Sequence, residues 1–217
     1  LLEKDIWVVW SLRSLFTSEH GRHLVFKGGT SLSKAYDVIR RFSEDIDLTY
    51  DIRAIAPDLI DGRDPPLPSS RSQAARWKDK IADRLDSLLA DELLPSLAKA
   101  LASLGASARK EGQEKIFIDY KARVTGTGYV KPTVILEFGA RSTGEPHETR
   151  WVRCDAAAHL PNIEFPEANP MVLSPHRTFW EKATAIHVFC RQGTFRGGDR
   201  FSRHWYDLTR LDATGFV

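Results

Sequence analysis

The chain has 217 residues, enough for one large domain or two small ones, and its composition is 42% hydrophobic and 28% charged, which is typical of a globular protein and excludes general disorder. Thirty-one Lys and Arg residues against 29 Asp and Glu give a net charge of only +2, which excludes a uniformly basic surface. Any binding of nucleic acid must therefore come from a local basic patch.

The small number of cysteines indicates a reducing compartment. Cys154 and Cys190 lack the paired spacing of a zinc site, and two cysteines are far fewer than in a secreted disulfide scaffold. No apolar run approaches the roughly 18 residues of a membrane-spanning helix, and we interpret the charged segment 1–16 as an amphipathic helix rather than a signal peptide. We therefore predict a cytoplasmic protein without a membrane partner. The chain begins without Met, which is compatible with a fragment of a longer protein.

A strand, a glycine turn, a helix and a second strand are predicted next. The apolar run 23–29 ends in two glycines, as a strand entering a tight turn does. Thr30 or Ser31 is a candidate N-cap for a helix that continues through residue 42. Residues 45–52 then alternate polar or acidic side chains with apolar ones, which predicts a strand.

The middle of the chain predicts a loop and then helices. Residues 57–72 are rich in proline, serine and glycine and are expected to form a surface loop or lid. Residues 73–104 repeat apolar side chains at helical intervals, with Pro95 marking a kink or a new helix start.

Three strands and two helices are predicted for the remainder. The first two strands are expected to be neighbours around a glycine turn at 126–128. The strands are predicted at 115–123, 129–141 and 148–156, and the helices at 176–192 and 200–211.

Two aspartates on the strand 45–52 form a candidate metal site. Residues two apart on a strand share one face and lie about 7 Å apart, so Asp45 and Asp47 point the same way while Ile46 points into the core. A divalent cation such as Mg²⁺ relieves the repulsion between two carboxylates and prefers oxygen ligands. An isolated D-x-D is more often an edge strand with a solvated acidic face.

The glycine pair at 28 and 29 favours the metal interpretation. Glycines let backbone N–H groups approach a ligand closely, and the start of a helix attracts anions, so this turn is a candidate phosphate cradle, although a plain turn has the same sequence. A cradle and a metal-binding pair joined by one helix are the two halves of a nucleoside triphosphate site.

Glu137 is the candidate third carboxylate. It lies in a run that is apolar on both faces, where a lone carboxylate is costly to bury unless it is paired or bound to a metal. If this strand neighbours 45–52, Glu137 falls beside the two aspartates. The alternative is an ion pair with Arg141 or Arg123.

These segments resemble a known family. KGGTSLSK and RFSEDIDL resemble the signature of the AbiEii/AbiGii nucleotidyltransferase toxins, within the DNA polymerase beta-like nucleotidyltransferase superfamily, and SPHRTFWEKATAIH and RHWYDLTRL resemble its later helices. Taken alone, Lys182 is equally an exposed residue beside a buried helix face, and Asp207 equally a structural ion-pair partner. The resemblance implies functional roles in three groups: triphosphate binding by Gly28, Gly29, Thr30, Ser31 and Lys182, metal binding by Asp45, Asp47 and Glu137, and catalysis by these three carboxylates, Lys182 and Asp207.

The resemblance also implies a fold and an activity. The expected fold is α/β, a small mixed sheet flanked by helices, with a nucleotidyltransferase core at 1–170 and a helical part at 171–217 that closes the site. The expected activity is the Mg²⁺-dependent transfer of a nucleoside monophosphate from an NTP to an acceptor hydroxyl, with Glu137 or Asp207 accepting the proton. The family consists of growth-inhibiting toxins of abortive-infection toxin–antitoxin systems, so a cognate antitoxin and the 3′ end of tRNA are the expected partners.

Cations and aromatic side chains alternate near the C-terminus, as on a surface that binds RNA. Ordinary helix packing with solvated arginines is the alternative, and we interpret His187 and His204 as packing residues without a metal. The candidate RNA-binding residues are Lys182, Arg191, Phe195, Arg196, Arg200, Phe201, Arg203, Trp205, Tyr206 and Arg210.

Two other functions remain open at this point. The same chemistry could modify a hydroxyl of an aminoglycoside-like small molecule, which drug-dependent release of pyrophosphate would reveal. A nucleotide-binding module without turnover would bind NTP and give no product with any acceptor, but such a module has no need of paired aspartates.

Overall fold

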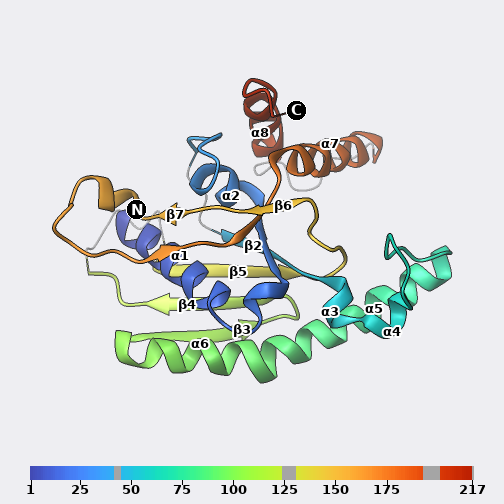
Figure 1. The fold of residues 1–217 in the computed structure, drawn as a ribbon, viewed down its shortest axis with the longest axis horizontal. Helices are drawn as coiled ribbons and strands as arrows, with labels where there is room; N and C mark the ends of the chain where they lie inside the picture. Colours follow the sequence, from blue (N-terminus) through green and yellow to red (C-terminus); the bar gives the residue numbers. More distant parts are fainter. Residues whose placement is uncertain (42–44, 124–130, 193–200, 217) are drawn as a thin grey trace.

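A computed structural model of the chain describes residues 1–41, 45–123, 131–192 and 201–216 (Figure 1). Within these residues a seven-stranded mixed sheet has the order β3-β4-β5-β2-β1-β9-β6, and β7 pairs with β8. The expected α/β class is confirmed. The strands are β1 Leu24–Lys27, β2 Asp45–Tyr50, β3 Ala106–Glu111, β4 Lys115–Tyr120, β5 Thr133–Gly139, β6 His147–Thr149, β7 Val152–Arg153, β8 Glu167–Ala168 and β9 Met171–Leu173.

The helices lie in two groups. In Figure 1, α7 and α8 project from the top of the molecule, whereas α5 and α6 run along the bottom. None of the helices within the described residues has the length and hydropathy to cross a membrane. The α-helices are α1 Leu2–Phe16, α2 Gly28–Lys34, α3 Ile52–Ile55, α4 Pro57–Ile60, α5 Arg71–Leu88, α6 Leu94–Leu101, α7 Pro175–Arg191 and α8 Ser202–Asp212.

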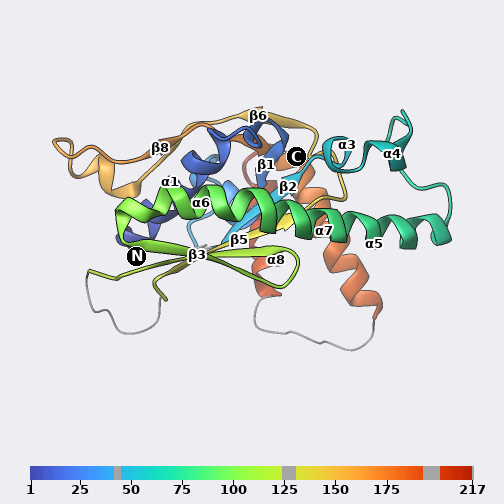
Figure 2. The same cartoon turned by 90° about the horizontal axis from the view of Figure 1, so that it is seen from below.

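The main core lies between one face of the sheet and the helices α1, α5 and α6, which Figure 2 shows crossing that face. Leu12 of α1 and Leu89, between α5 and α6, are fully buried there, as are Ile46 and Leu136 from the sheet. The strands place alternate residues in this core, so the residues between them face the opposite side. Asp45 and Asp47, on either side of Ile46, therefore project away from the main core.

A smaller core joins α2 to α8. It contains Leu32, Val38, Ile39 and Leu211, with Phe179 of α7 packed against it. This cluster fixes the C-terminal helices beside the carboxyl end of β1 and the start of α2.

The helix after the glycine pair is shorter than expected. It begins at Gly28 without a side-chain cap, so neither Thr30 nor Ser31 is its N-cap, and it ends at Lys34 rather than near residue 42. Asp37 adopts a left-handed backbone conformation with φ 51°. The chain leaves the helix early because Val38 and Ile39 turn back into the smaller core.

Other expectations for the N-terminal two thirds are mostly confirmed. The helix 73–104 is present as α5 and α6, joined by a π-helical turn at Leu89–Leu93 and followed by a short 3₁₀ turn, and Pro95 is at the start of α6. The predicted loop begins instead with α4, while 61–70 has no regular structure. β3 was not predicted, because its alanines are small and its remaining side chains are polar.

The C-terminal third differs more in its strands than in its helices. The predicted strand 148–156 is two short strands, β6 and β7, and the glycine turn at 126–128 lies outside the described residues. The expected helices are present as α7 and α8. β9, in the main sheet, begins at Met171, so the segment 171–217 opens with a strand of the sheet before it becomes helical. The division at residue 170 remains a prediction.

Candidate active site

The glycine turn connects β1 directly to α2. Gly28 has φ +78°, a conformation that favours glycine. A Cβ atom at this position would lie 2.0 Å from Oδ2 of Asp47. The turn therefore requires glycine for two separate reasons, its backbone conformation and the close approach of a carboxylate.

The aspartates and the turn line one pocket of about 350 Å³. This confirms the expectation that Gly28, Asp45 and Asp47 converge on a single cavity. The lining residues are Lys27, Gly28, Gly29, Arg41, Asp45, Asp47, Thr178, Glu181, Lys182, Arg203 and His204.

Asp47 has a strongly perturbed pKa. Burial, reinforced by the negative charge of Glu137, raises its pKa to about 6, although the cations Lys27 and Lys182 act in the opposite direction. Lys27 is the direct neighbour of Asp47 across the antiparallel strands β1 and β2. An added cation would stabilise the ionised form of Asp47, because burial and a nearby like charge are what disfavour it.

Thr30 and Ser31 do not present their hydroxyl groups to the pocket. Both side chains are buried, and the hydroxyl of Thr30 donates to the backbone carbonyl oxygen of Asp45 at 2.5 Å. The hydroxyl of Ser31 donates to the carbonyl oxygen of Gly28 at 2.9 Å. Their predicted contact with a triphosphate can therefore come only from backbone N–H groups.

Glu137 lies where the strand order was expected to place it. β2 and β5 are parallel neighbours, with Asp47 opposite Glu137. Its ion-pair partner is Lys115 at 2.9 Å, and neither Arg141 nor Arg123, the two partners considered from the sequence, forms a described ion pair with it. Glu137 lines a second pocket of about 320 Å³, which shares Lys27 and Asp47 with the first.

The fit of this site to a divalent cation rests on two carboxylates. No group of three or more His, Cys, Asp or Glu side chains within the described ranges is arranged to enclose a metal ion. Asp45 and Asp47 supply the hard oxygen ligands that Mg²⁺ prefers, and Mg²⁺ commonly completes its shell with water and substrate phosphate. Two carboxylates therefore suffice, and a metal-binding role for Glu137 remains a prediction.

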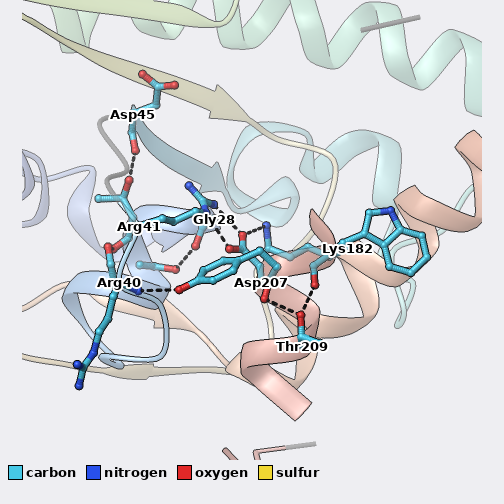
Figure 3. Close-up of polar contacts among 12 residues, drawn as sticks. Gly28, Arg40, Arg41, Asp45, Lys182, Asp207 and Thr209 are labelled. Atoms are coloured by element: carbon cyan, nitrogen blue, oxygen red, sulfur yellow. Dashed lines mark hydrogen bonds and ion pairs between the residues drawn. The ribbon is translucent and has the colours of Figure 1, made fainter. Parts of the chain in front are cut away.

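Lys182 and Asp207 are brought together, with a third residue that the sequence did not suggest. Asp207 of α8 is completely buried and pairs with Lys182 of α7 at 2.9 Å. The guanidinium group of Arg41 donates two further hydrogen bonds to the same carboxylate, at 2.8 and 2.7 Å (Figure 3). Lys182 and Arg41 line the first pocket, whereas Asp207 lies behind them.

Four more residues of the first pocket, Lys27, Thr178, Glu181 and His204, were not identified as site residues from the sequence, and Arg203 was identified only as a candidate RNA-binding residue. Lys27 directly precedes the glycine pair, and this position in the sequence could have identified it as a site residue. Thr178, Glu181, Arg203 and His204 reach the pocket only because α7 and α8 pack beside it, which no local pattern indicates. Glu181 pairs with Lys27 at 3.7 Å. Burial, with the nearby charge of Lys182, lowers the pKa of His204, so this pocket residue is expected to be neutral at pH 7.

The candidate RNA-binding residues fall into four groups. Arg191, Arg203, Trp205 and Tyr206 are exposed. Lys182 is engaged with Asp207 and lines the first pocket. Phe201 is buried, and Arg210 donates a hydrogen bond to the carbonyl oxygen of Val38, so these two are packing residues rather than parts of an open surface. The residues outside the described ranges are Phe195, Arg196 and Arg200.

Comparisons with known proteins identify the family. Residues 10–216 match the family described as the nucleotidyl transferase AbiEii toxin of type IV toxin–antitoxin systems. No curated protein matches the chain. Among solved structures, the chain is similar to MenT4, a nucleotidyltransferase toxin from Mycobacterium tuberculosis H37Rv, with 18% identity and a TM-score of 0.43. That alignment covers 83% of this chain and 51% of MenT4, so the chain spans about half of that protein. Since the family match covers nearly the whole sequence, the chain belongs to the AbiEii family of nucleotidyltransferase toxins.

Proposed function

We propose that the protein transfers a nucleoside monophosphate from an NTP to an acceptor hydroxyl. The observation that carries this proposal is the first pocket, in which the glycine turn, two aspartates and several cations converge. Anionic phosphates are bound by cations and N–H groups, whereas a metal ion is bound by carboxylates. This pocket has both kinds of group within one cavity of about 350 Å³.

The triphosphate is held by backbone and by cations. Gly28 and Gly29 have no side chains, so their backbone atoms line the pocket. The backbone N–H groups of Thr30 and Ser31 follow them at the start of α2. Lys182 contributes a positive charge from the part of the lining that α7 forms.

Asp45 and Asp47 would hold Mg²⁺. The bound ion would neutralise charge on the phosphate oxygens and orient the triphosphate. The raised pKa of Asp47, about 6, supports this assignment, because burial and the charge of Glu137 disfavour its ionised form, which a bound cation would stabilise.

The transfer itself is an in-line displacement. The acceptor oxygen attacks the α-phosphorus, the bond from that phosphorus to the oxygen bridging to the β-phosphate breaks, and pyrophosphate leaves with the bonding electron pair. We assign the acceptor proton to Glu137, which lines the pocket on the other side of Asp47 and has a half-exposed carboxylate. Asp207 is less suited to this step because it is buried and both of its oxygens accept hydrogen bonds from cations.

The acceptor and biological role follow from the family. We propose a tRNA 3′ end as acceptor, growth inhibition in the cytoplasm as the outcome, and a cognate antitoxin as the partner that prevents it. Arg203, which lines the first pocket, and Trp205, which is 55% exposed, support an RNA acceptor because cations contact phosphates and aromatic rings stack on unpaired bases. Within the predicted C-terminal part, 171–217, we assign the closing of the nucleotide pocket over the core to α7 and α8, which contribute Thr178, Glu181, Lys182, Arg203 and His204 to its lining.

This proposal would be tested by incubating the protein with one labelled NTP at a time and either purified tRNA or total RNA. Label should appear in tRNA with Mg²⁺, vanish with EDTA and vanish in Asp47→Ala. Asp119→Asn is a matched control because Asp119 lines neither pocket and should retain activity. If a small molecule gains the label and RNA never does, the acceptor is a small molecule rather than RNA. If NTP binds but no product forms with any acceptor, the protein is not an enzyme of this kind. Transfer that persists in Asp47→Ala would refute the site.

A further inference from the structure

Three segments that are far apart in the sequence meet at the carboxylate of Asp207. Nε and Nη2 of Arg41 donate to Oδ1 and Oδ2 at 2.8 and 2.7 Å, which is the two-pronged geometry of a fixed guanidinium–carboxylate pair. Nζ of Lys182 approaches Oδ2 at 2.9 Å. Figure 3 shows both cations converging on this one side chain.

The charges of this cluster do not cancel. One carboxylate faces two cations, so the unit carries a net charge of +1. Burial alone would raise the pKa of Asp207, but the hydrogen bonds from Arg41 and the charge of Lys182 outweigh it and bring the pKa below its ordinary value. Asp207 is therefore ionised at neutral pH, and the surplus positive charge belongs to the two cations.

That surplus charge faces the nucleotide pocket. Arg41 and Lys182 both line the pocket with the glycine turn, whereas Asp207 is fully buried behind them. A guanidinium group held on one edge by a carboxylate is restricted to a single orientation, so little side-chain entropy remains to be lost when it binds a second anion.

We infer that Arg41 is a second triphosphate-binding cation beside Lys182, and that Asp207 is the positioning residue that orients Arg41 and Lys182 toward the phosphates. This inference rests on the proposed function for the identity of the nucleotide ligand. It gives Asp207 a role without proton transfer, because its carboxylate is occupied by the two cations that it orients.

Substitutions at Arg41 test the binding role. Binding of NTP and of inorganic tripolyphosphate would be measured by titration calorimetry, and KM and kcat by transfer assays. Arg41→Ala should weaken binding and raise KM for NTP on the order of 10- to 100-fold, the loss expected for charged hydrogen bonds. Arg41→Lys keeps the positive charge but lacks the planar guanidinium group, so it should recover only part of the affinity for NTP and tripolyphosphate.

Arg40 provides the matched control. It is the preceding residue, carries the same charge and is exposed, and Figure 3 shows its side chain extending away from Asp207. Arg40→Ala should leave KM for NTP and tripolyphosphate affinity within about 2-fold of wild type, a difference well under 1 kcal/mol. Equal losses in the Arg40 and Arg41 variants would overturn the inference, as would an Arg41→Ala protein with unchanged affinity.

Asp207→Asn separates positioning from simple charge. This variant makes the pocket more positive, so an electrostatic effect alone predicts tighter binding of tripolyphosphate, whereas loss of positioning predicts weaker binding. Weaker binding with an unshifted pH profile of kcat supports the inference. Unchanged binding with a lower kcat and an altered pH profile would instead make Asp207 a proton acceptor. Circular dichroism would establish that the variant is folded, and the Arg41 variants decide the question if it is not.

Failure of the proposed function would be distinguishable from failure of this inference. If wild type binds tripolyphosphate in an Arg41-dependent way but transfers no nucleotide, the inference stands and the enzymatic role fails. If wild type transfers nucleotide and Arg41→Ala has unchanged KM, the enzymatic role stands and the inference fails.

Discussion

Oδ2 of Asp47 lies where a side chain at position 28 would begin, 2.0 Å from the Cβ that any residue other than glycine would carry. The side chain of Asp47 on β2 thus packs directly against Gly28 of the glycine turn. A phosphate bound by the backbone of the turn would lie close to a cation bound by Asp47, so this contact sets the spacing of the two halves of the proposed site.

Gly28→Ala is expected to lower transfer activity at least 100-fold and to destabilise the protein by more than about 1 to 2 kcal/mol, the cost of the left-handed conformation alone. The excess comes from the clash with Asp47. Gly62→Ala is the control, because Gly62 has φ +70° with nothing within 4 Å of its Cβ position. Urea denaturation and transfer assays would measure both variants, and an equal effect at the two glycines would contradict the direct contact with Asp47.

Asp47→Asn is expected to stabilise the metal-free protein near pH 7.5. A carboxyl group whose pKa is raised from 3.8 to about 6 binds more protons in the folded state than in the unfolded state, so its contribution to stability falls as pH rises through that window. The ionised group costs on the order of 2 to 3 kcal/mol above pH 6, and the variant avoids this cost.

The comparison should be made with EDTA at pH 4 and pH 7.5, because the advantage of Asp47→Asn is expected only at the higher pH. Asp119→Asn should have the opposite sign. Although partial burial opposes it, hydrogen bonds from Thr133 and Arg109 lower the pKa of Asp119, so its contribution is present above pH 3.8 and lost as pH falls further. An Asp47→Asn protein that is less stable than wild type at pH 7.5 would refute the raised pKa.

Glu137→Gln is expected to lower kcat by about 10²- to 10⁴-fold, the range for loss of a general base, with KM for NTP nearly unchanged. Glu114→Gln is the matched control, since Glu114 lines the same second pocket and pairs instead with Arg141. Steady-state kinetics over a range of pH would distinguish the two. Similar losses in both variants would show that the second pocket depends on its total charge rather than on Glu137.

Lys34→Ala is expected to destabilise the protein by about 3 kcal/mol. Lys34 contacts Asp5 at 2.6 Å and Asp155 at 2.7 Å, and the Asp5 side chain is only 9% exposed, so removing the cation leaves a buried carboxylate uncompensated. Asp155 is 69% exposed, and Asp155→Ala should cost less than about 1 kcal/mol. Chemical denaturation measures both, and equal losses would contradict a buried Lys34–Asp5 pair.

Local patterns in the sequence were sufficient for the acidic strand. The alternation around Ile46 predicted β2 and the shared direction of Asp45 and Asp47, because strand periodicity depends only on neighbouring residues. A place in the middle of the sheet also followed for the strand of Glu137, since its run is apolar on both faces, but its pairing with β2 was a condition that only the structure met.

Longer-range features could not be read in the same way. Arg41, Lys182 and Asp207 meet only because α8 packs against the segment after α2, and contacts across 166 residues leave no periodic signal. The hydroxyl directions of Thr30 and Ser31 depend on backbone acceptors that exist only in the folded chain. β3 escaped detection because Ala106 and Ala108, its inward-facing residues, are too small to produce a hydrophobic pattern.

The late position of Asp207 in the chain has a consequence for toxin synthesis. A ribosome that has completed the sheet and α7 has already made Arg41 and Lys182, but not the carboxylate that both of them contact. Nascent and prematurely terminated chains that lack α8 would thus carry two unanchored cations, so the candidate pocket would be complete only after translation has passed residue 207.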